Sequence, residues 1–225
     1  MRARRVAGRP SRHRVAVWGL RLAVFLGVLS AVAQVISYHY GLRDHILDSS
    51  SDKSVAGALT ALLLAATVGI AWLLALALRR PRAVLLAACV SVVFALELTD
   101  PPHRVALSAP VGLLAVVLIW RLGTSDELAG PLLRAGCVVL AVAFAAHWSG
   151  SWVVDRLDLA TDSWLYQLKE IVKHSGELAA WTLIGSGLLI LRLGQSLAEH
   201  LRQVAARADE PEPQLVLVHE LPERP

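Results

Sequence analysis

Residues 55–78 read VAGALTALLLAATVGIAWLLALAL and contain no Asp, Glu, Lys or Arg. A helix of roughly 20 apolar residues crosses a bilayer core of about 30 Å, so this stretch is long enough to span a membrane. Residues 135–154 form a second such run. Over all 225 residues, 56% are hydrophobic and only 18% are charged, whereas soluble domains carry about 25% charged residues. The sequence therefore predicts an all-α fold, a polytopic bundle of transmembrane helices.

Polar and proline-containing segments divide the chain into six expected helices. Arg79–Arg82 ends the second, and Thr99–Pro102 ends the third, because proline cannot continue the backbone hydrogen-bond ladder. The third and fourth helices are short, which leaves a re-entrant hairpin open as an alternative. We expect a transmembrane domain over residues 16–193, with helices at about 16–37, 55–78, 83–98, 105–120, 135–154 and 172–193.

Lysines and arginines are distributed unequally between the two sides of this arrangement. Fifteen lie on one side and six on the other, with Arg21 inside the first helix. Because cytoplasmic loops carry an excess of Lys and Arg, we expect both termini in the cytoplasm and the protein in the plasma membrane. Residues 1–15 form a basic arm, which also attracts anionic lipid. Since these arginines precede an apolar helix, nucleic acid is not an expected partner; the oligomeric state is left open.

The first helix also resembles a signal peptide, with a basic start, an apolar stretch and Ala31-Val32-Ala33. An uncleaved anchor is favoured because the apolar run continues to Ile36. At the other end, residues 194–225 are expected to begin as a helix and to become disordered in the acidic, proline-rich part. Two cysteines, Cys89 and Cys137, lie inside apolar runs and are expected to pack as small hydrophobic residues.

Ionisable residues gather at the expected outer ends of the helices, opposite the basic arm. Within the last helix, Glu170, His174 and Glu177 follow the spacing i, i+4, i+7, which places them on one face. Ionisable groups at membrane depth are costly and usually functional. The sequence therefore predicts an outward-facing polar site, whose candidate residues are Glu97, His103, His147, Glu170, His174 and Glu177.

Several kinds of chemistry fit these residue types. Carboxylates and imidazoles bind zinc and other divalent metals, and the candidate metal ligands are Glu97, His147, His174 and Glu177. Such groups also relay protons or hold a cationic solute. A structural interpretation is equally open: Lys173 and Glu177 have the spacing of a helical ion pair, and His147 adjoins two tryptophans of an aromatic belt.

The sequence contains no HExxH, Walker A, GxSxG, GxGxxG or CxxC motif. In the last helix, Gly185-Ser186-Gly187 is expected to be a close-packing contact with a neighbouring helix.

Three segments resemble parts of a family of uncharacterised bacterial multi-pass membrane proteins, over about residues 40–192. They are LDSSSD at 47–52, LELTDPPHR at 96–104 and HSGELAA at 174–180. The family has an Asp-rich outer loop, a Leu-Asp-Glu stretch followed by His-Glu after helix three, and Glu-x-x-Glu followed by Gly in its last helix. This resemblance implies a shared helical fold and no particular activity.

Three candidate site residues match the family pattern, namely Glu97, His103 and Glu177. The departures are Leu98, Arg104, His174 and Ala180. They imply that any site of the family is partly lost in this chain.

Three functions remain open from the sequence. The first is a non-enzymatic binder, sensor or transporter component with an outward-facing polar site. The second is a membrane-embedded metal-dependent hydrolase, and the third is a structural or assembly subunit without a site. A common cavity containing the candidate residues would favour the first two.

Overall fold

The computed structural model describes residues 12–41, 54–99, 104–124, 126–157 and 163–208. Most of the predicted basic arm, the Asp-rich loop, His103 and the acidic tail lie outside these residues. The helices are α1 (Arg12–His39), α2 (Val55–Leu78), α3 (Pro81–Thr99), α4 (Arg104–Gly123), α5 (Ala129–Arg156) and α6 (Trp164–Ala208). The described part of the chain is thus all-helical, which confirms the predicted fold class.

Five of these helices are long and apolar enough to cross a membrane: α1, α2, α3, residues 129–150 of α5 and residues 164–196 of α6. The apolar part of α4, Ala109–Gly123, is shorter. The third predicted helix is therefore long enough to span a membrane.

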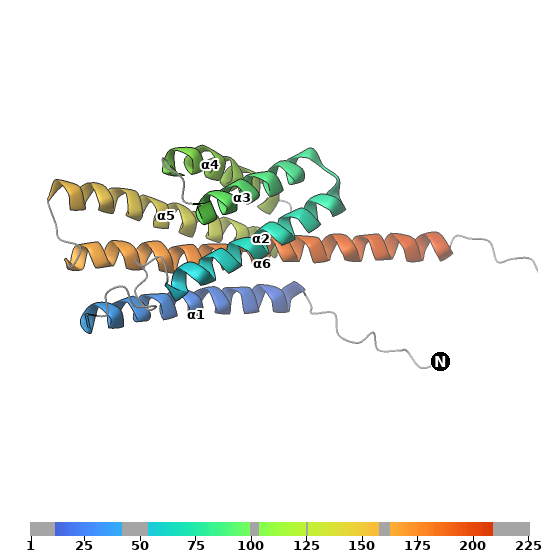
Figure 1. The fold of residues 1–225 in the computed structure, drawn as a ribbon. Coiled ribbons are helices and arrows are strands. Elements are labelled where there is room, and N and C mark those ends of the chain that lie inside the picture. The colour runs from blue at the N-terminus through green and yellow to red at the C-terminus, as the bar shows by residue number, and fades with distance from the viewer. Residues whose placement is uncertain (1–11, 42–53, 100–103, 125, 158–162, 209–225) are drawn as a thin grey trace, which may run out of the picture.

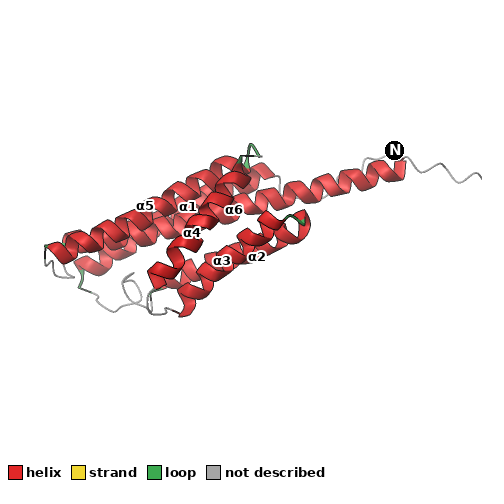
Figure 2. Ribbon diagram, turned by 90° about the horizontal axis from the view of Figure 1, so that it is seen from above, coloured by secondary structure: helices red, strands yellow, loops and turns green. Residues whose placement is uncertain are grey.

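The helices form two groups (Figures 1 and 2). The long helices α1, α5 and α6 run side by side, and α2, α3 and α4 lie beside them. The groups join where α2 packs on α6 and where α4 packs on α5. Arg12 lies near Gly194 at one end, and Tyr38 contacts Trp164 at the other. We call the end near Arg12, which also contains the α2–α3 turn, the hairpin end. The end near Tyr38 is called the Trp164 end.

The central helix α6 packs against three partners at one level. Gly185 faces Thr67 of α2, and Gly187 faces Leu133 of α5. Between them, Ser186 lies against Gly19 of α1, where an added Cβ would overlap the serine side chain. The predicted close-packing role of Gly185-Ser186-Gly187 is therefore confirmed.

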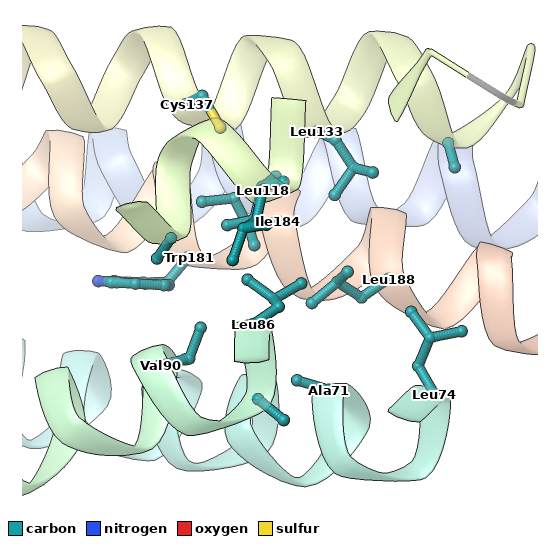
Figure 3. Close-up of a cluster of buried hydrophobic side chains, with 14 of the residues drawn as sticks. Ala71, Leu74, Leu86, Val90, Leu118, Leu133, Cys137, Trp181, Ile184 and Leu188 are labelled. Carbon is teal, nitrogen blue, oxygen red and sulfur yellow. The ribbon is translucent and has the colours of Figure 1, made fainter. Parts of the chain in front are cut away.

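Buried apolar side chains surround this level of α6 (Figure 3). Ile184 and Leu188 are fully buried and form one cluster with residues of α2, α3, α4 and α5. Both cysteines belong to this cluster and are free and buried, which confirms their expected role as small core residues. A helix that is apolar on every side must be covered by neighbours or by lipid, and here neighbours cover it.

Two helices begin at least six residues earlier than expected, and a polar side chain accepts hydrogen bonds at the start of each. The helix α5 starts at Ala129 rather than at residue 135, since Asp126 Oδ1 accepts hydrogen bonds from the backbone N–H groups of Leu128 and Ala129 at 3.0 and 2.9 Å. The helix α6 starts at Trp164 rather than at residue 172, and Ser163 Oγ accepts a hydrogen bond from its first turn at 3.3 Å. Such caps satisfy donors that have no partner inside the helix.

Asp126, which caps α5, also links α5 to α1 at the hairpin end of the bundle. The guanidinium of Arg12, in the first turn of α1, forms an ion pair with the Asp126 carboxylate. Partial burial favours a raised pKa for Asp126, but the hydrogen bonds from Ala129 and Leu128 and the Arg12 charge outweigh it. The pKa of Asp126 is consequently lowered from its ordinary value.

A lowered pKa in the folded state makes Asp126 a stabilising group above its unfolded pKa of about 3.9, and this contribution is lost as the pH falls below that value. We expect Asp126→Ala to reduce the free energy of unfolding at pH 7 by about 1 kcal/mol, the usual worth of a cap. The variant should also be less sensitive to acid than the wild type. Unfolding in mixed micelles at pH 3 to 7 measures both effects. Glu127→Ala, at an exposed neighbour, is the control, and an equal acid response in Asp126→Ala and wild type would contradict this role.

Candidate functional site

The buried polar residues at the Trp164 end centre on Glu170 of α6. Its carboxylate accepts Lys169 Nζ at 2.9 Å and His174 Nε2 at 3.2 Å. The Glu170 residue is only 4% exposed, and the side chains of Lys169 and His174 are 8% and 12% exposed. These ionisable groups therefore point into the helix bundle. We call Lys169, Glu170, His174 and Glu177 the α6 cluster.

The His174 ring links the two carboxylates of the α6 cluster. Its Nδ1 atom lies 3.6 Å from Glu177 Oε2, while Nε2 meets Glu170. The predicted shared face of Glu170, His174 and Glu177 is therefore present. The charge neighbour of Glu170 was not predicted, because the sequence suggested Lys173 and Glu177 as the helical pair.

Lys169 is the residue that the sequence analysis missed as part of the site. Its aliphatic stem lies against Gly150 of α5, where an added Cβ would meet the lysine Cγ and Cδ at 2.5 and 2.8 Å. Its ammonium lies 4.4 Å from the ring centroid of Tyr166, a favourable cation–π geometry. The absence of a side chain at position 150 thus makes room for a lysine between two helices. No local pattern reveals this, because the two positions lie far apart in the sequence.

His147 joins the α6 cluster from α5. It lies within electrostatic range of Lys169, Glu170, Lys173 and His174, and it is half-buried. The neighbouring Trp148 is 64% exposed and fits the aromatic belt that the sequence predicted. His147 is thus a neighbour of the α6 cluster, whereas the belt interpretation fits the tryptophan.

The α1 side of the same region is polar but uncharged. Gln34 is 1% exposed and donates a hydrogen bond to Gln167 of α6 at 2.6 Å. Ser30 and Ser37 are also buried. These residues were not predicted as part of a site, although their spacing places them on one face of α1. Small and polar residues at such positions allow helices to approach closely.

Glu97 is not part of this arrangement. It lies near the end of α3, which packs against α2 and α4, whereas the α6 cluster lies where α1 and α5 pack on α6. His103 lies outside the described residues. The structure therefore brings together His147, Glu170, His174 and Glu177, and leaves Glu97 apart.

The candidate metal site does not form among the residues that the structure describes. Within them, no three His, Cys, Asp or Glu side chains lie in a geometry that could hold a metal ion. The physical reason is that Glu97 is on the other group of helices, and Glu170 and Glu177 are turned toward His174 and Lys169. Their arrangement is that of a network of ion pairs and hydrogen bonds.

No model of a known protein family matches this chain, and no curated protein or solved structure matches it either.

Proposed function

We propose that this chain is a non-enzymatic integral membrane protein that binds or senses a small solute or ion at the α6 cluster. The single observation that carries this proposal is Glu170, 4% exposed and held between Lys169 and His174. Buried ions at membrane depth are expensive, and they usually mark ligand sites or proton relays. A merely structural role would be served as well by apolar side chains, which often replace buried ion pairs without loss of stability.

A binder or sensor is favoured over a complete transport path. Toward the hairpin end, α6 continues with buried apolar residues, among them Leu183, Ile184 and Leu188. A path for ions needs polar groups on both sides of the midplane. Between residues 178 and 191 the described part of α6 contains no ionisable side chain, so a transporter role requires further protein chains.

The proton is the smallest ligand that such a network can bind, and it serves as the probe. On α6, His174 faces Glu170 and Glu177; His147 of α5 lies in range, and α1 contributes uncharged side chains here. The helix α2 contains no ionisable residue between 55 and 78. The range tested is pH 5 to 8, because an unperturbed histidine side chain changes its charge there.

The test follows Trp181, which is buried on the same face of α6 as His174. In phosphatidylcholine nanodiscs, we expect tryptophan fluorescence to change between pH 5 and 8, and the change to disappear in Trp181→Phe. His174→Gln should abolish it, whereas His39→Gln, at an exposed α1 histidine, should preserve it. An unchanged response in His174→Gln would remove the sensing role and leave a structural subunit as the better interpretation.

We further propose that the protein resides in the plasma membrane as a multi-pass protein with both termini in the cytoplasm. This is supported by the excess of Lys and Arg on the side of the hairpin end. A reporter fused after residue 225 that is active only in the cytoplasm should be active, and one inserted in the loop of residues 42–53 should be inactive. The reverse pattern would contradict this orientation.

The kinship with uncharacterised bacterial multi-pass membrane proteins is also a proposal. It is supported by the matches at Glu97, His103 and Glu177. A structure of a family member that shows a different helix order would contradict it.

A further inference from the structure

At the hairpin end, α2 and α3 border a groove that the proposed function does not use. Its volume is about 590 Å³, and its walls include Trp72 and Leu76 of α2 and Val84 of α3. Arg79 and Arg80, in the turn between the helices, line it as well. The groove therefore combines apolar walls with two positive charges at one end.

The walls of the groove are exposed rather than packed. Leu76 is 69% exposed, and Val84 is also exposed. The indole N–H of Trp72 donates a hydrogen bond to Ser91 Oγ at 3.1 Å, which holds the ring across the two helices. In a membrane, an open apolar groove of this kind lies against the acyl chains of lipids.

The charges of the groove have no protein partner in the described residues. No ion pair to Arg79 or Arg80 is formed there, and both side chains are exposed. From Trp72 to Arg79 the helix rises about 10 Å, so Trp72 lies beside the acyl chains when the arginines stand at headgroup level. The planar guanidinium matches the geometry of a phosphate.

The backbone of Arg79 gives independent support. It is the C-cap of α2 in the left-handed region at φ 49°, and its N–H donates to Ala75 O. Glycine or asparagine usually occupies such a position, because other residues are strained there. An arginine at this strained position supports a role for its side chain.

We propose that the α2–α3 groove binds one anionic phospholipid, with the phosphate on Arg79 and Arg80 and an acyl chain along Trp72, Leu76 and Val84. Charge complementarity selects an anionic headgroup, and basic pockets between membrane helices bind such lipids. This site is distinct from the basic arm of residues 1–15, and it does not depend on the α6 cluster.

The test uses the full chain, delipidated in detergent and titrated with dioleoyl phosphatidylglycerol or dioleoyl phosphatidylcholine. Native mass spectrometry measures the affinity for the first bound lipid. The test variant is Arg79→Gly with Arg80→Gln. Its control is Arg82→Gln with Arg121→Gln, which removes the same charge from two exposed arginines outside the groove walls. Glycine at position 79 relieves the backbone strain, so the test variant should melt no lower than the wild type.

We expect the wild type to prefer phosphatidylglycerol, and the test variant to lose on the order of thirtyfold in that affinity, at about fivefold per arginine. The control variant should keep the preference. In Val84→Trp, the larger ring should occupy the groove and weaken both lipids. Equal losses in the test and control variants would show a diffuse charge effect and overturn the proposal, as would a wild type without preference.

Discussion

Replacing Glu170 with alanine is expected to lower the free energy of unfolding by about 3–5 kcal/mol, the usual cost of removing one member of a buried ion pair. The loss arises because the Lys169 ammonium stays buried beside Gly150 without its carboxylate. His174 loses its partner at Nε2 at the same time. The measurement is unfolding in mixed detergent micelles, followed by circular dichroism.

The matched control is Glu127→Ala, which removes an exposed carboxylate and should cost less than about 0.5 kcal/mol. The double variant Lys169→Met with Glu170→Leu should recover most of the stability, because apolar residues of similar volume often replace buried pairs without loss. If Glu170→Ala costs no more than Glu127→Ala, water reaches the α6 cluster and the buried network does not exist as described. Full stability in the double variant, together with a lost pH response, would separate function from folding at this site.

The second large effect is expected at Gly136 of α5. A Cβ there would lie 2.7 Å from Ile184 Cγ1 and 3.1 Å from the backbone oxygen of Ala180. The backbone of α6 cannot move aside without disturbing its other contacts. We expect Gly136→Ala to cost about 1–3 kcal/mol, the usual range for overpacking, and Gly136→Leu to cost more or to prevent folding.

Gly69 of α2 provides the control for this prediction, because nothing lies within 4 Å of a Cβ added there. Gly69→Ala should be neutral or slightly stabilising, since glycine inside a helix is unfavourable by roughly 0.5–1 kcal/mol relative to alanine. The same unfolding assay compares the two alanine variants directly. Equal stability in both would mean that α5 and α6 do not pack as closely as the structure shows.

The fold could be predicted from the sequence because lipid imposes a simple requirement. Uncharged runs such as residues 55–78 must form helices with all their backbone hydrogen bonds satisfied, and hydropathy finds them. The start of α6 was predicted eight residues late, because hydropathy alone does not extend the helix across the polar residues Gln167 and Lys169. They are helical because α1 and α5 extend to the same level and cover them, through Gln34 and Gly150.

The candidate site was predicted only where its residues share one helix. The spacing of Glu170, His174 and Glu177 defines a face whatever the neighbours are. The expected inclusion of Glu97 depended on the order in which helices pack, which hydropathy does not contain. Lys169 was missed for the same reason, because its burial depends on a glycine in another helix.

The meeting of three helices on three consecutive residues of α6 has a mechanical consequence. Gly185, Ser186 and Gly187 each face a different neighbour, so α6 cannot turn about its axis without colliding with at least one of them. It is also a single helix of 45 residues, about 68 Å long, and its last turns reach past the other helices (Figure 1). We therefore expect a displacement of α6 near Lys169 to tilt the whole helix about the level of Gly185, Ser186 and Gly187. The tilt would move the C-terminal turns of α6, which lie beyond the opposite end of the bundle.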